Sequence, residues 1–187
     1  MSHNYCTSLS HLVLSIVSIT CFKKINSLES NNGLTMSGFV IIILHSLLGV
    51  WKWGNPLHGR AVDKPYKFVG FLKEMLAFPC IVGQLWFKLN GNAVVAYLHP
   101  LVSLIPFILR SRKMSRFGNK DTFMLMEIFS CCLVSFMTEN YFGVACAIAY
   151  GLNHFLIQDE YLNMPSIDIY NYAFCFFTYF SYRALCG

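Results

Sequence analysis

A block of positive charge between two apolar runs constrains this chain more than any other feature. Residues 110–120 read RSRKMSRFGNK and hold five Lys and Arg, between the apolar runs 93–109 and 122–137. Moving such a block across a bilayer is costly, so it indicates a loop held on the cytoplasmic side of a membrane. The sequence therefore predicts membrane-spanning segments on both sides of this loop.

The composition supports lipid as the solvent of this chain. Hydrophobic residues make up 56% of the sequence and charged residues only 12%, against about 25% charged residues in soluble domains. The formal net charge of +5 comes from basic residues that flank apolar segments. Nucleic-acid binding is not expected, because a nucleic-acid-binding module gathers such residues on one face.

Seven apolar segments predict an all-α, polytopic helical membrane protein with seven transmembrane helices in a single integral membrane domain. The predicted spans are residues 8–22, 36–53, 68–89, 93–109, 122–137, 141–157 and 169–185. Most of them are short beside the roughly 17–25 residues that cross a bilayer. Short spans are typical of thin membranes, so we expect the endoplasmic reticulum or another endomembrane.

The distribution of Lys and Arg predicts the orientation. Nine of them fall in the loops on the side of the N-terminus, four fall on the opposite side, and Lys73 lies inside a span. The side richer in Lys and Arg usually faces the cytosol. We therefore expect a cytosolic N-terminus and a lumenal or extracellular C-terminus.

Polar residues inside the spans form the candidate site. Charges are rare in spans and usually face the interior of the bundle. The predicted orientation places five polar residues in the cytoplasmic half: Lys73, Glu74, Glu127, Asn153 and His154. One interpretation is a functional intramembrane cluster. The other is a structural ion pair in which Lys73 and Glu127 face each other, while Glu74 and His154 reach the interface.

Two further histidines and the basic loop complete the candidates. His45 and His99 are isolated polar residues in the second and fourth spans, and each is either functional or bonded to a neighbouring helix. We expect the basic loop to add affinity for anionic lipid. The alternative is that its charges only fix the orientation of the chain in the membrane. Its basic residues are Arg110, Arg112, Lys113, Arg116 and Lys120.

The sequence offers little support for an enzyme, a metal or a cofactor. The eight cysteines form no C-x-x-C pair, and no histidines are spaced His-x-x-x-His, so neither a zinc site nor a disulfide framework is indicated. There is no G-x-S-x-G or H-E-x-x-H, and the aspartates at 63, 121, 159 and 168 are expected in loops. His45, Ser46, His99 and His154 supply only a fragment of the His, Ser and Asp set of seven-span hydrolases of the ceramidase and adiponectin-receptor type.

Two stretches resemble a known family. SLSHLVLSIVS near the N-terminus, and TENYFGVACAIAYGL with the final QDEYLNMPSIDIYNYAFCFFTYFSYRAL, are similar to the transmembrane protein 276 family of small multispanning proteins. The resemblance covers the first two and last two spans. It implies a seven-span fold and, because the family has no established activity, it implies no catalytic or binding residue.

Together these features predict a multi-pass membrane protein that binds a membrane lipid or a membrane partner protein. The alternatives are a transporter of a small solute, including a proton-coupled one, and an intramembrane enzyme that modifies lipid. A transporter usually shows matched internal repeats with broken helices, and no repeat is visible in this sequence.

Overall fold

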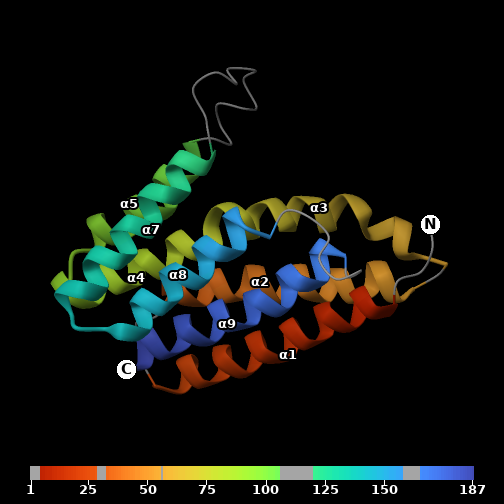
Figure 1. Ribbon diagram of the computed structural model, residues 1–187, viewed down its shortest axis with the longest axis horizontal. Helices are drawn as coiled ribbons and strands as arrows, with labels where there is room; N and C mark the ends of the chain where they lie inside the picture. The colour runs from red at the N-terminus through yellow and green to blue at the C-terminus, as the bar shows by residue number, and fades with distance from the viewer. Residues whose placement is uncertain (1–4, 29–32, 56, 106–119, 158–164) are drawn as a thin grey trace.

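The computed structural model describes residues 5–28, 33–55, 57–105, 120–157 and 165–187. Every regular element in these residues is a helix, which confirms the all-α prediction. In chain order they are α1 (Tyr5–Leu28), α2 (Gly33–Gly54), η1 (Gly59–Val62), α3 (Asp63–Leu72), η2 (Lys73–Ala77), α4 (Phe78–Asn90), α5 (Ala93–Ser103), α7 (Lys120–Met137), α8 (Tyr141–Phe155) and α9 (Ser166–Cys186) (Figure 1).

Each predicted span overlaps a helix, although residues 106–109 of the fourth span lie outside the described residues. η1, α3, η2 and α4 join into one helix, Gly59–Asn90. Of the basic loop, the first four cations, Arg110, Arg112, Lys113 and Arg116, lie outside the described residues. Lys120, which the sequence assigned to that loop, is instead the first residue of α7.

Three helices of the described chain are long and apolar enough to cross a membrane, which supports a membrane protein: Tyr5–Ser27, Gly33–Gly54 and Gly59–Asn90. The others are shorter or more polar. At 1.5 Å per residue, the 11 residues of α5 and the 15 of α8 extend only about 16 and 22 Å. A hydrocarbon core is about 30 Å thick. Seven membrane crossings therefore stay a prediction.

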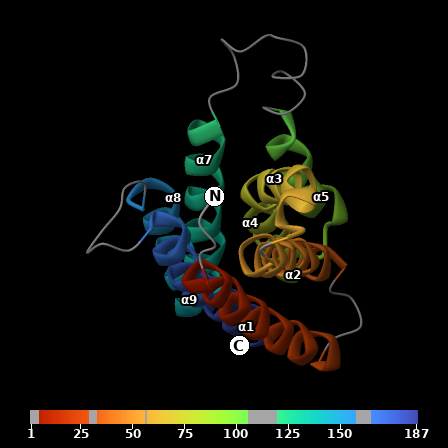
Figure 2. The same ribbon diagram turned by 90° about the vertical axis from the view of Figure 1, so that its right-hand side faces the viewer.

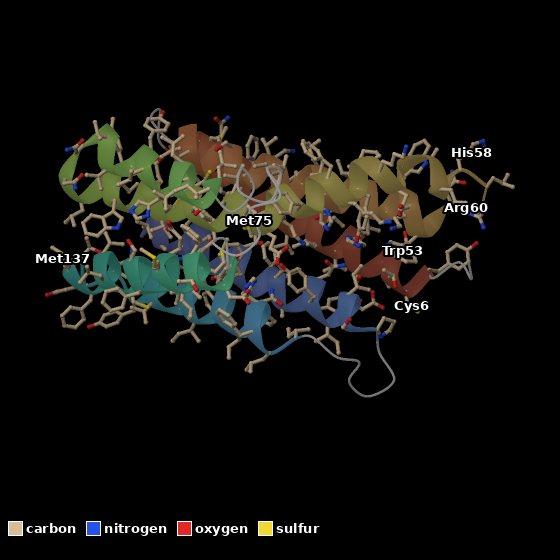
Figure 3. The ribbon with its side chains drawn as sticks, turned by 90° about the horizontal axis from the view of Figure 1, so that it is seen from above. Cys6, Trp53, His58, Arg60, Met75 and Met137 are labelled. Atoms are coloured by element: carbon tan, nitrogen blue, oxygen red, sulfur yellow. The ribbon has the colours of Figure 1, made fainter. Side chains whose placement is uncertain are left out.

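The helices run mostly along the long axis of the bundle, with the two termini at opposite ends (Figure 1). α1 packs between α2 and α9, α8 packs on α9, and α7 bridges α8 and α4, while α5 lies against α4 (Figure 2). Cys6, Trp53, His58 and Arg60 mark one end and Met137 the other, with Met75 between them (Figure 3). We call the first of these the N-terminal end.

The interior of the bundle changes character along this axis. Towards the end that carries the C-terminus, the buried side chains are mainly apolar, among them Ile81, Leu85, Val134 and Leu185. Polar side chains such as Gln84, Ser135 and Ser181 are buried there too. From the middle of the bundle to the N-terminal end, the buried polar and ionisable side chains include Ser10, His11, His45, Lys73, Asn153, Asp168 and Asn171, and we call this part the polar half. These buried polar groups need hydrogen-bond or ion-pair partners inside the bundle.

Pro79 accounts for the break in the third long helix. Residues Lys73–Ala77 form a π-helix, in which each carbonyl pairs with the amide five residues later. For the carbonyl of Glu74, that amide would belong to residue 79, which is a proline and has no N–H. The Tyr150 hydroxyl, 2.9 Å away on α8, donates to this carbonyl. Pro79 thus removes one possible backbone donor to η2, and the Tyr150 hydroxyl of α8 supplies a donor to the same carbonyl.

Candidate functional site

Lys73 is a buried lysine that forms no direct ion pair with a carboxylate of the described residues, although the Glu74 carboxylate on the next residue attracts its charge. Its side chain is only 5% exposed. The ammonium nitrogen lies 4.5 Å from the ring centre of Tyr170 and 4.9 Å from that of Phe174, both on α9. Among the described residues, no carboxylate forms an ion pair with it and no oxygen accepts its hydrogen bonds. The predicted pair between Lys73 and Glu127 is therefore wrong.

Glu127 instead faces α5. Its Oε2 lies 2.9 Å from Nδ1 of His99, and the indole of Trp86 is stacked on the imidazole with ring centres 6.4 Å apart. The Trp86 indole N–H donates to the Ser130 hydroxyl at 2.8 Å. His99 is therefore not isolated. The His99–Glu127 pair connects α5 to α7, and the Trp86 ring covers the imidazole.

The other acidic residues meet His154. Its Nε2 lies 3.1 Å from Oδ1 of Asp121 on α7, and its Nδ1 lies 3.8 Å from Oε1 of Glu74 on η2. Side-chain exposure falls from 47% for Asp121 through 30% for Glu74 to 7% for His154. The structure thus unites Glu74 and His154, as the cluster interpretation predicted, and adds Asp121, which the sequence had assigned to a loop. This acid–imidazole cluster connects the surface to the interior.

Asn153 lies next to this cluster with its hydrogen-bonding groups unused. It is 1% exposed, and neither its amide nitrogen nor its amide oxygen has a partner among the described residues. Tyr150, one turn earlier on α8, is stacked on Phe78 with ring centres 4.2 Å apart. Asn153 therefore places one donor group and one acceptor in the polar half with nothing to bond.

Two buried histidines pack together where α1, α2 and α3 meet. The ring centres of His11 and His45 are 5.5 Å apart, and Tyr66 is stacked on His45 at 4.6 Å. The Tyr66 hydroxyl lies 3.2 Å from Nε2 of His11. A Cβ at Gly49 would collide with the His11 ring, and one at Gly70 would lie 2.9 Å from His45. The two glycines make room for the imidazoles, so this cluster is tightly packed, although the Nδ1 atoms of both histidines have no hydrogen-bond partner among the described residues.

Asp168 joins α9 to α1. It was expected in a loop, but it occupies the first turn of α9 and is only 2% exposed. Its Oδ1 lies 3.0 Å from the Ser10 hydroxyl, which also lies 3.0 Å from the amide nitrogen of Asn171. This network was missed because residues 158–168 read as a polar linker.

A signal for the polar half was present in the first helix. Buried polar side chains recur there every three or four residues, at Thr7, His11, Ser15 and Ser18. This spacing repeats on one face of a helix. A polar stripe in an apolar segment indicates a face directed into the bundle.

The groups gathered here can bind a polar ligand but do not resemble a metal centre. Among the described residues, no three or more His, Cys, Asp or Glu side chains are placed to hold a metal ion. In the part of the chain that the structure describes, the polar half offers the Lys73 ammonium without an ion pair, the unpartnered Asn153 amide and an acid–imidazole cluster that reaches the surface. Asn171 Oδ1 and the Nδ1 atoms of His11 and His45 also have no hydrogen-bond partner there.

No protein-family model, curated protein or solved structure matches the chain.

Proposed function

We propose that this protein is a multi-pass membrane protein that binds a membrane lipid, with the lipid headgroup held in the polar half of the bundle. The observation that carries this proposal is Asn153, whose amide is buried and whose two polar atoms have no partner among the described residues. Leaving a buried polar group unpaired costs about 1–3 kcal/mol. Phosphate, ester and carboxylate oxygens of a headgroup supply the missing acceptors.

The surroundings of Asn153 support a lipid rather than a water-soluble ligand. Leu152 and Leu156, on the same helix, are 50% and 60% exposed, as is expected of side chains that face acyl chains. Phe68 on α3 is 55% exposed. A headgroup beside Asn153 can therefore keep its chains against apolar side chains on the outside of α3 and α8.

We place this site in the cytosolic leaflet of an endomembrane, with the N-terminus cytosolic. The support is the excess of Lys and Arg in the loops on the side of the N-terminus. In this orientation the acid–imidazole cluster opens towards the cytosolic surface. A membrane partner protein is the other candidate ligand, but the unpartnered amide lies inside the bundle, where a headgroup has better access.

Native mass spectrometry of the protein, extracted from its membrane in a mild detergent, tests the proposal. We expect one lipid to stay bound at detergent concentrations that remove the surrounding bilayer lipids. The variant Asn153→Leu replaces the amide by an apolar group of similar size, and we expect it to lose that lipid.

The matched control is Asn90→Leu, at the exposed end of α4. This variant should retain the lipid as the wild-type protein does. Absence of a bound lipid from the wild-type protein, or equal retention by Asn153→Leu, would contradict the proposal.

A further inference from the structure

We infer that Lys73 is the counter-ion for a monoanionic lipid headgroup, such as a phosphodiester or a fatty-acid carboxylate. The inference rests on the proposed function and specifies the class of lipid. A buried ammonium without a counter-ion is costly, since charges inside proteins are normally paired. In the described residues, the direct contacts of the ammonium are the aromatic faces of Tyr170 and Phe174, and the adjacent Glu74 carboxylate attracts it without a direct ion pair.

The two rings satisfy the hydrogen-bonding capacity of the ammonium only in part. A cation over a ring is attracted by the negative face of that ring, and both rings belong to α9. An ammonium has three N–H donors, and ring faces accept them only weakly. An anionic oxygen that approaches from the side away from α9 therefore gains a charge-assisted hydrogen bond.

Helix packing brings Asn153 to the level of Lys73. α8 and α9 are antiparallel neighbours, and Tyr150 contacts Phe174 with ring centres 6.5 Å apart (Figure 1). One turn later on α8 is Asn153, and one turn earlier on α9 is Tyr170, so these two residues share a level. Because the Lys73 ammonium lies over Tyr170, the unpaired cation and the unpaired amide occupy the same layer of the bundle.

Glu74 limits the charge that this layer accepts. Its carboxylate is on the residue next to Lys73 and lies 3.8 Å from His154. A single negative charge on the ligand matches the single ammonium of Lys73. A second negative charge would face Glu74 and Asp121 without a cation of its own. The site should therefore prefer monoanions to zwitterions and to dianions such as phosphomonoesters.

The test measures binding of three lipids to the detergent-solubilised full-length protein by native mass spectrometry. The probes are phosphatidylglycerol as the monoanion, phosphatidylcholine as the zwitterion and phosphatidic acid as the phosphomonoester. We expect phosphatidylglycerol to bind at least tenfold more tightly than either of the others. Water-soluble glycerophosphoglycerol, which carries the same headgroup without acyl chains, should bind at least tenfold more weakly than phosphatidylglycerol.

Two variants assign the preference to Lys73. Lys73→Met should remove the tenfold preference, and Lys73→Arg, which keeps the charge, should retain most of it. Lys64→Met, at an exposed position on α3, is the matched control and should behave as wild type. Gel filtration and thermal melting establish that each variant is folded, and Lys73→Arg carries the test if Lys73→Met does not fold.

The outcomes separate this inference from the proposed function. Equal binding of the three lipids by the wild-type protein would overturn the assignment of a monoanion but leave lipid binding intact. An unchanged preference in Lys73→Met, or a preference lost equally in Lys73→Arg and Lys73→Met, would overturn the role of the charge. If no lipid binds the wild-type protein, both the inference and the proposed function fail.

Discussion

Gly49 is the position at which a single methyl group should disturb the polar half most. A Cβ at this position would collide with the His11 ring, which is buried between α2 and α3. Gly49→Ala therefore forces the imidazole to shift. Inserting a methyl group into a packed core costs about 1–3 kcal/mol. Loss of the contact between His11 and the Tyr66 hydroxyl adds about 0.5–1.5 kcal/mol.

We therefore expect Gly49→Ala to lower the free energy of unfolding by about 1.5–4.5 kcal/mol, the sum of overpacking and the lost hydrogen bond. The assay is reversible denaturation in detergent micelles, followed by circular dichroism. Gly151→Ala is the control, because its added Cβ would meet only the Ile128 methyl group at 3.4 Å. That substitution should leave stability unchanged or raise it, since alanine favours the helix over glycine by about 1 kcal/mol.

A double substitution distinguishes a collision from a general effect on α2. His11→Ala removes the ring that Gly49→Ala would strike, so the double variant should be more stable than the sum of the two single effects predicts. Coupling of this type between contacting residues is typically 0.5–3 kcal/mol. Strict additivity of the two changes, or a Gly49→Ala variant as stable as wild type, would refute the packing described here.

Three further predictions concern the helix break, the His–Glu pair and the topology. Tyr150→Phe removes the donor to the Glu74 carbonyl and should lower the free energy of unfolding by about 1–3 kcal/mol. Adding Pro79→Ala should recover part of this loss, because alanine restores a backbone N–H at position 79. No recovery would contradict the assignment of the helix break to Pro79. Glu127→Leu should destabilise the protein more than Glu127→Gln, which keeps an acceptor for His99; equal losses in thermal melts would exclude that hydrogen bond. A glycosylation sequon should be modified at the C-terminus and not at the N-terminus; the reverse pattern would overturn the predicted orientation.

Most of the helices could be predicted from the sequence because they correspond to apolar runs between polar breaks. The exceptions are η1 and the first half of α3, which are polar and precede the predicted third span. The depth of the polar residues was also predictable, since depth follows from position along a helix at about 1.5 Å per residue. Glu74 and His154 do meet, as their common depth suggested. Sequence position thus places a side chain along the axis of a bundle.

The neighbour that each side chain faces was not predictable in the same way. Lys73 and Glu127 were placed at a common depth, yet Lys73 faces α9 and Glu127 faces α5. Direction around a helix depends on which helices pack against it, and that order is a property of the whole bundle. The π-helix before Pro79 also changes the direction of the side chains that follow it, because its turn is wider.

Asp168 shows a different limit. It is adjacent to an acidic stretch with a proline, a pattern typical of an exposed loop, yet it is buried against Ser10 on α1. The contact joins residues 158 positions apart. Local composition carries no information about such a partner. The seven crossings and the resemblance to the transmembrane protein 276 family stay predictions.

Photo-cross-linking tests the central claim most directly, that a lipid headgroup lies inside the polar half. A phosphatidylglycerol analogue with a photoreactive group on its headgroup is bound to the purified protein, activated by light, and the labelled peptides are sequenced by mass spectrometry. We predict that the label falls on η2 and on α8 near Asn153, and that unlabelled phosphatidylglycerol suppresses it. Labels confined to outward-facing residues such as Phe129 and Phe136, which are 70% and 82% exposed, would contradict the claim.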